Sequence, residues 1–128
     1  MPATASFDYA ILRVVPRVER QEFINAGVVV FCLEKRYLAA RIHLDEQRLR
    51  ALWPAIDVEL VREHLEAIPR VCAGDPAAGP IAMLSQRERF HWLISPRSTI
   101  IQPSPVHTGL CESTDELLER LAKQLLEI

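Results

Sequence analysis

AGVVVFCLEKRYLAARIHL, residues 26–44, contains the strongest secondary-structure signal in the chain. Residues 26–33 are a continuous apolar run of strand length, and residues 34–36 form a polar Glu-Lys-Arg turn. Apolar and polar residues then alternate as far as Leu44, which places one set on an inner face: Leu38, Ala40, Ile42 and Leu44. Arg41 and His43 fall on the opposite face. The pattern predicts an antiparallel β-hairpin, although its turn lacks glycine.

A second strand is predicted before this hairpin, at residues 7–15. Both of its faces are largely apolar, which is typical of a strand in the interior of a sheet. Arg13 is the exception, because it shares a face with Phe7, Tyr9 and Ile11. Pro16 should end the strand, since proline cannot donate to a ladder of hydrogen bonds.

Two helices are predicted after the hairpin. Asp45 can cap a short helix that ends at Leu52, and Asp57 can cap a longer one. The longer helix has an apolar stripe at three- and four-residue steps: Val58, Val61, Leu65, Ile68 and Cys72. Pro69 lies inside that stripe and predicts a kink or an end.

The last third of the chain has weaker patterns. Beyond a loop at residues 74–80, we expect a short helix near residues 85–90 and two short strands at 98–102 and 106–111. Residues 113–116, Ser-Thr-Asp-Glu, match a capping box. The terminal helix behind it would bury a stripe of four residues: Leu118, Leu121, Leu125 and Ile128.

This order of elements predicts an α+β fold. We expect a mostly antiparallel sheet of four to five strands with three to four helices packed on it. A chain of 128 residues suits one domain, so we assign residues 1–128 to a single domain.

The composition argues against several classes of protein. A net charge of -2 is unlike that of proteins that coat nucleic acids, which are strongly basic. No apolar run approaches the roughly 20 residues that span a bilayer, and the first residues do not resemble a signal peptide. We therefore expect a cytoplasmic protein that does not contact the membrane. Cys32, Cys72 and Cys111 match no metal or redox spacing and are interpreted as core residues.

No catalytic or cofactor motif is evident. The four histidines do not have the spacing of metal ligands, and no glycine-rich phosphate loop or nucleophile elbow occurs. We therefore predict no metal and no cofactor, and Glu22 is a weak candidate for an acid or base.

Two places are unusual for a protein without a ligand. A buried Arg13 needs a partner, because an unpaired buried charge costs several kcal/mol, on the order of 3–5. Arg13 either pairs with an acidic residue of the chain (Glu19, Glu22 or Asp8) or extends its guanidinium to the solvent. Alternatively, its guanidinium lines a pocket for an external anion. Arg97 and Ser98 beside a proline-fixed turn could contact an anion too, and Gln102 and Ser104 follow them closely in the sequence. Asn25, between the first two strands, is a further candidate for orienting such a ligand.

Two further features have alternative interpretations. Asn25 and Gly27 suit a turn or bulge, or a ligand-facing loop with left-handed or closely approaching backbone. Arginines alternate with aromatic residues at 87–97, which could bind nucleic acid through Arg87, Arg89 and Trp92. Equally, three apolar residues of this stretch could be core anchors: Phe90, Trp92 and Leu93.

Three blocks of the sequence resemble a known family. Residues 9–16 (YAILRVVP), 22–30 (EFINAGVVV) and 96–104 (PRSTIIQPS) are similar to the signature blocks of the bacterial domain-of-unknown-function family three-zero-three-seven. The likeness extends from about Phe7 to Leu126. The resemblance implies a stand-alone bacterial protein. Its relatives are associated with genes for kinase-fold proteins that resemble the HipA toxin. This association implies an accessory role with such a protein as a partner. The family provides no catalytic residues.

Three hypotheses follow. The leading one is a non-catalytic accessory or interaction protein that binds another bacterial protein; an exposed apolar patch would support it. The alternative is an anion-binding protein or small enzyme acting on a phosphate or carboxylate group, which requires Arg13 and Arg97 to converge in one pocket. The third is binding of RNA or single-stranded DNA, which the net charge disfavours.

Overall fold

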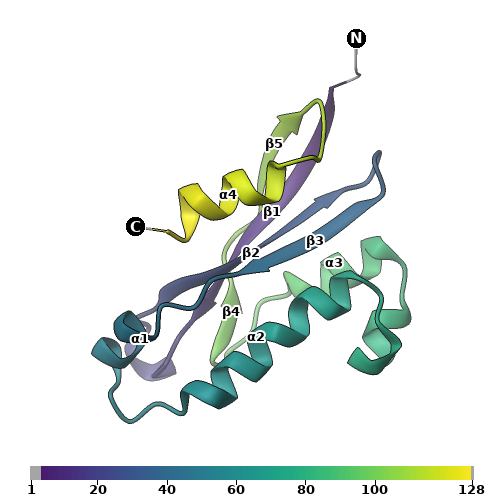
Figure 1. Ribbon diagram of the computed structural model, residues 1–128. Helices are drawn as coiled ribbons and strands as arrows, with labels where there is room; N and C mark the ends of the chain where they lie inside the picture. The colour runs from purple at the N-terminus through teal and green to yellow at the C-terminus, as the bar shows by residue number, and fades with distance from the viewer. Residues whose placement is uncertain (1–3, 128) are drawn as a thin grey trace.

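A computed structural model describes residues 4–127 and has a five-stranded sheet with helices on both faces (Figure 1). The strands are β1 (Ala5–Val14), β2 (Ile24–Cys32), β3 (Tyr37–Ile42), β4 (Ile101–Pro103) and β5 (His107–Cys111). The helices are α1 (Glu46–Leu52), α2 (Val58–Cys72), α3 (Gln86–Leu93) and α4 (Leu117–Leu125). Every strand pairing is antiparallel, so the predicted α+β fold is confirmed.

β1 is the central strand, as its two apolar faces predict. β2 pairs along one side of it and β3 pairs with β2, which confirms the predicted hairpin. The other side of β1 is shared by two short strands: β5 pairs with its beginning, from Ala5 to Tyr9, and β4 pairs with its end, from Leu12 to Val14. β1 is therefore hydrogen-bonded on both sides over most of its length.

The sheet separates two apolar cores. On one face, Leu12 and Val14 pack with residues of α1, α2 and α3, including Val61 and Leu65. The stripe predicted for α2 is buried there in full. On the other face, α4 packs over β2 and β3, with Leu117 and Leu121 in the same core as Phe7 (Figure 1). Ile128, which completed the predicted stripe of the last helix, lies outside the described residues.

A bulge in β2 sets which residues face which core. Leu12 pairs with Gly27 and Arg13 pairs with Asn25, so Ala26 is an extra residue in β2. A Cβ atom on Gly27 would lie 2.8 Å from Cδ1 of Ile42, so a larger residue at this position would clash with the Ile42 side chain. The bulge and the close approach that the sequence suggests at Asn25 and Gly27 are confirmed. The left-handed backbone that it also suggests there is wrong.

The turn between β2 and β3 contains no glycine, and an arginine adopts the backbone conformation that a glycine would favour. Arg36 adopts a positive φ of 50°, the left-handed conformation that glycine usually supplies. Its N–H donates to the carbonyl of Leu33 at 3.2 Å, which closes the turn.

Several predicted boundaries are corrected. β4 begins at Ile101, because residues 98–100 bend before they reach the sheet. α2 continues through Pro69 to Cys72. The capping box predicted at residues 113–116 is wrong: Glu116 has a φ of 62°, and its side chain does not cap α4. A true capping box forms at α3 instead, where Ser85 and Glu88 satisfy each other's backbone N–H groups.

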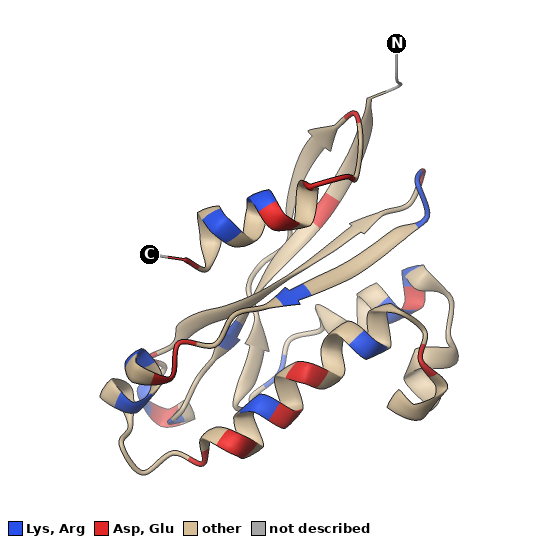
Figure 2. Cartoon of the chain, in the orientation of Figure 1, with Lys and Arg blue, Asp and Glu red and all other residues tan. Residues whose placement is uncertain are grey.

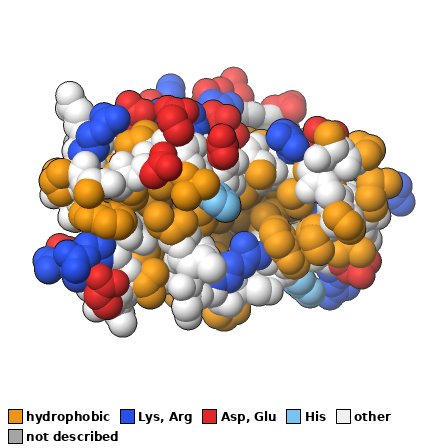
Figure 3. Space-filling view, turned by 90° about the horizontal axis from the view of Figure 1, so that it is seen from below, with side chains coloured by type: hydrophobic (Ala, Val, Ile, Leu, Met, Phe, Trp, Pro, Cys, Tyr) orange, Lys and Arg blue, Asp and Glu red, His pale blue; other side chains and the backbone are white. Residues whose placement is uncertain are grey.

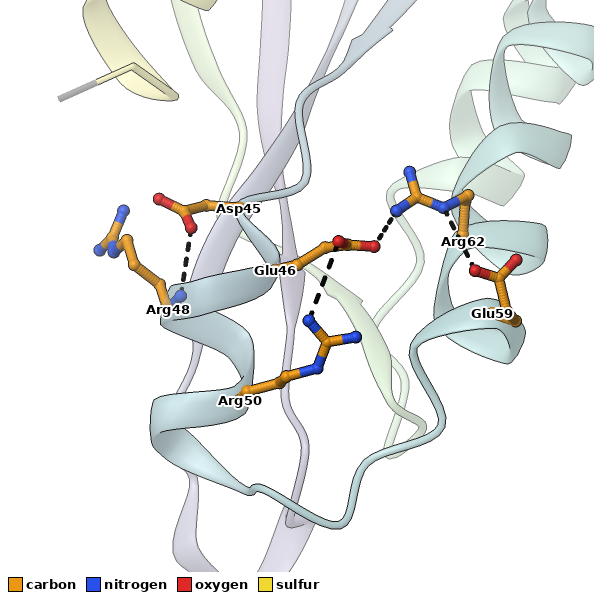
Figure 4. Close-up of polar contacts among 6 residues, drawn as sticks. All are labelled: Asp45, Glu46, Arg48, Arg50, Glu59 and Arg62. Atoms are coloured by element: carbon orange, nitrogen blue, oxygen red, sulfur yellow. Dashed lines mark hydrogen bonds and ion pairs between the residues drawn. The ribbon is translucent and has the colours of Figure 1, made fainter.

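Polar contacts connect α1 to α2 across the loop between them (Figure 4). Glu46 of α1 forms an ion pair with Arg62 of α2 and a looser one with Arg50, at 3.9 Å. Asp45 caps α1 by accepting from the N–H of Arg48 at 3.1 Å. Acidic and basic residues lie together along the outer surface of α2 (Figure 2). Pairs this exposed contribute roughly 0–1 kcal/mol each, so the apolar stripe holds α2 on the sheet.

The packing of Phe7 on Gly109 gives a test of the fold. An alanine Cβ at position 109 would lie 2.6 Å from Cζ of Phe7, whose ring is buried between β5 and α4. Gly109→Ala should lower the free energy of unfolding by about 1–3 kcal/mol, because the ring must move in a filled core. Urea unfolding measures this. Leu110→Ala, at an exposed position of the same strand, is the control; equal midpoints for the two variants would contradict the packing.

Candidate functional site

Four of the predicted site residues line one pocket, named here the arginine pocket. It has a volume of about 330 Å³ and lies where the end of β1 meets the connections before β2 and β4. Arg13, Arg97, Ser98 and Gln102 contribute to it. Its remaining walls come from four residues with no charged side chain: Val15, Val18, Gln21 and Phe23.

Strand pairing brings these distant segments together. Arg13 lies opposite Gln102 in the pairing of β1 with β4. The N–H of Val15 donates to the carbonyl of Ile100 at 2.7 Å, which extends the pairing beyond β4 and holds residues 97–100 beside the end of β1. The convergence of Arg13 and Arg97 that the anion hypothesis requires is therefore a consequence of the sheet.

None of the three acidic residues considered as partners pairs with Arg13. Glu19 accepts a hydrogen bond from Arg17 at 2.9 Å, and Glu22 pairs with Arg20. Asp8 accepts a hydrogen bond from the hydroxyl of Thr108 at 2.9 Å.

Arg13 contacts an aromatic ring instead of an acid. Its guanidinium lies over the ring of Phe23, 4.3 Å from the centroid. Its Nε atom is buried and has no hydrogen-bond partner among residues 4–127. A cation–π contact stabilises the charge in part, but it leaves the N–H donors of the guanidinium unused.

Arg97 is held in a similar way. Its guanidinium lies 4.2 Å from the centroid of the Trp92 ring and donates to the carbonyl of Trp92. Burial lowers the pKa of Arg97 from its ordinary value, although the group remains charged at neutral pH. In the part of the chain that the structure describes, neither Arg97 nor Arg13 has an ion pair with Asp or Glu.

Glu22, the weak acid–base candidate, is not among the residues that line the arginine pocket. The hydrogen bond from Arg20 lowers the pKa of its carboxyl below the ordinary value. Glu22 is therefore ionised at neutral pH and is a poor proton donor.

Ser104 lies outside the pocket lining and has a structural position. It is only 4% exposed, at the break between β4 and β5. Its N–H donates to the carbonyl of Ile11 at 2.7 Å. In return the N–H of Ile11 donates to the Ser104 hydroxyl at 2.8 Å, and that hydroxyl donates to the carbonyl of Pro105 at 2.9 Å. The side chain thus completes the hydrogen bonding of β1 where the neighbouring strand is interrupted.

Asn25 is also outside the pocket lining. Its side-chain amide donates to the carbonyl of Leu125, near the end of α4, in a long hydrogen bond of 3.4 Å. Its Oδ1 atom is buried and has no hydrogen-bond partner within the described chain.

The stretch from Arg87 to Arg97 is divided between core and surface. Phe90 and Leu93 are buried, as the core interpretation predicts, whereas Trp92 is 40% exposed. Arg89 donates to the carbonyls of Val71 and Cys72, at 3.0 and 2.6 Å, and so caps the end of α2. Arg89 is therefore not free to contact a nucleic acid, whereas Arg87 and Trp92 are exposed.

Other chemistry has little support in the described residues. Residues 4–127 contain no group of three His, Cys, Asp or Glu residues that could hold a metal ion. The three cysteines are free and buried, which confirms their interpretation as core residues, and burial raises the pKa of Cys72 to about 12. No helix in this range is both long enough and apolar enough to cross a membrane.

Comparison with known proteins identifies a family. The model of a family described as "Protein of unknown function (DUF3037)" matches residues 9–126, a range that includes every residue of the arginine pocket. No curated protein and no solved structure matches the chain.

The position of Ser104 predicts the effect of its replacement. Ser104→Ala should lower the free energy of unfolding by about 1–3 kcal/mol, because the Ile11 N–H loses its acceptor inside the sheet. Chemical denaturation measures the loss. Ser98→Ala, at an exposed position, is the control and should change stability by less than about 0.5 kcal/mol. A stable Ser104→Ala protein would mean that the hydroxyl is not needed at the strand break.

Proposed function

The chain belongs to the DUF3037 family of proteins of unknown function, and we propose that it is a binding protein that holds a carboxylate or phosphate group in the arginine pocket. One observation carries the proposal. Two guanidinium groups line the same pocket, and no acidic side chain of residues 4–127 neutralises either of them.

The energetics of an unpaired arginine support an external anion. Taking a guanidinium partly out of water without a partner is costly, whereas a bound anion supplies both a countercharge and hydrogen-bond acceptors. The planar guanidinium fork suits the paired oxygens of a carboxylate or phosphate. Phe23 and Trp92 hold the two groups by stacking, which orders the side chains before a ligand arrives.

The lining residues favour binding over catalysis. The titratable groups of the arginine pocket are Arg13 and Arg97, and neither is suited to accept a proton at neutral pH. Ser98 and Gln102 add a hydroxyl and an amide, which can orient an anion. The Gln102 amide already donates to the carbonyl of Thr99 at 2.8 Å and so has a defined position.

The bearer of the anion is most simply another protein, and we propose a cytoplasmic bacterial partner. Val18 and Phe23 line the pocket and are 38% and 44% exposed, so apolar surface surrounds the charged groups. Such a mixture of aromatic, apolar and arginine side chains is typical of the centre of protein interfaces.

Phosphate titration tests the pocket. We expect the Nε–H NMR signals of Arg13 and Arg97 to shift with inorganic phosphate or acetate at constant ionic strength, while that of Arg48, exposed on α1, stays unchanged. Arg13→Gln and Arg97→Gln should each weaken phosphate binding about tenfold or more, since a charged hydrogen bond contributes roughly 1.5–3 kcal/mol.

Arg48→Gln is the matched control for these variants, because it removes the same charge from a surface helix. Its phosphate affinity should stay within about twofold of wild type. Equal losses in all three variants, or Arg13 and Arg97 signals that do not shift with phosphate, would contradict a specific anion site in the arginine pocket.

A further inference from the structure

A second concave surface adjoins the arginine pocket. This apolar groove has a volume of about 280 Å³ and lies between α2 and the segment that leads from α3 into β4. Ala67, Ile68 and Val71 of α2 form one side of it, and Trp92, Ile100 and Ile101 form much of the other. Figure 3 looks toward the molecule from this side and shows hydrophobic side chains gathered around a hollow, with basic and histidine side chains beside it.

Arg97 joins the groove to the arginine pocket, because it lines both. One of its N–H groups is used by the carbonyl of Trp92. The guanidinium has five N–H donors in total, so donors remain for a ligand. An apolar site and an anion site therefore lie side by side, with one arginine between them.

Trp92 is the most informative residue of the groove. It is 40% exposed although it is the largest apolar side chain of the segment, and its ring is held in place under Arg97. Tryptophan and arginine are the residues most enriched among those that dominate binding energy at protein interfaces. A stacked pair of them at the edge of an open apolar groove is the arrangement expected of a partner-binding surface.

We propose that the ligand is a peptide segment of another protein in which a large apolar side chain lies next to a carboxylate. The apolar side chain occupies the groove, and the carboxylate binds Arg13 and Arg97. This inference rests on the proposed anion-binding function and adds the kind of peptide segment that the partner protein presents. Charge complementarity selects an acidic peptide, since the two arginines between the subsites have no acidic partner among residues 4–127.

Side chains rather than added β-structure would recognise this segment. Peptides that extend a sheet need free N–H and C=O groups along an edge strand. At β4 the carbonyl of Ile101 already accepts from the hydroxyl of Thr99 at 3.0 Å, and Pro103 has no N–H. Proline near an exposed edge also discourages pairing with another strand.

Selection from a phage-displayed random heptapeptide library supplies the probe. Peptides selected on the folded full chain should contain a large apolar residue within one or two positions of Asp or Glu. A synthetic copy of the best peptide, labelled with fluorescein, then gives affinities by anisotropy. Replacing its acidic residue with the matching amide, or its apolar residue with alanine, should each weaken binding about tenfold or more.

Variants of the chain separate the two subsites. Ala67→Gln places a long side chain in the apolar groove and should weaken peptide binding about tenfold while phosphate binding stays within twofold. Arg13→Gln should weaken the binding of both probes. Glu63→Gln, exposed on α2, is the matched control and should change neither. Ala78→Gln, at another residue that lines the groove, repeats the test if Ala67→Gln unfolds.

The outcomes distinguish this inference from the function on which it rests. If Arg13→Gln weakens phosphate binding but neither Ala67→Gln nor Ala78→Gln weakens peptide binding, the peptide proposal is wrong and the proposed anion-binding function is retained. Peptides without an apolar–acidic pair, or a selection that yields no binder, would also overturn the peptide proposal. Phosphate and peptide binding that are both unaffected by Arg13→Gln would overturn the two proposals together.

Discussion

The pairing of β1 on both sides is the constraint on which the rest of the structure depends. β2 lines one side of the strand, while β4 and β5 divide the other side between them. The break between the two short strands would leave the half-buried N–H of Ile11 without an acceptor inside the sheet, and the Ser104 hydroxyl provides one. With the central strand satisfied, its two faces are free to bury separate cores, one under α1–α3 and one under α4.

The pairing of β1 with β4 also brings together the residues of the candidate site. Arg13 lies near the end of β1, opposite Gln102, and the continuation of this pairing brings Arg97 to the same pocket. Local acids do not reach Arg13, because Glu19 and Glu22 pair with the arginines two residues before them. A strand arginine stacked on Phe23 is thereby left with unused donors. The protein holds two ordered positive charges that its own described chain does not neutralise.

Much of the fold was predictable because it depends on local periodicity. Alternation identified the β2–β3 hairpin, and the three- and four-residue spacing identified the buried face of α2. Features set by tertiary contacts were not predictable in this way. Ser85 and Ser113 are each followed three residues later by a glutamate, which is the sequence pattern of a capping box. Only Ser85 caps a helix, because Glu116 adopts a left-handed backbone. For the site, the sequence suggested Arg13 and Arg97 as candidates because of their residue type. Their common pocket could not be predicted, because it depends on the register of β1 with β4. The contribution of the Phe23 ring to the pocket wall also depends on the tertiary fold.

The claim that both arginines bind one anion is tested most directly by a double-mutant cycle. Phosphate affinity is measured by NMR titration for wild type, Arg13→Gln, Arg97→Gln and the double variant, at fixed ionic strength. If both guanidinium groups contact the same phosphate, the two losses are not additive, and the coupling is at least about 0.5 kcal/mol. Additive losses, or losses no larger than that of Arg48→Gln, would show that the arginines act as separate surface charges, which contradicts a shared anion site.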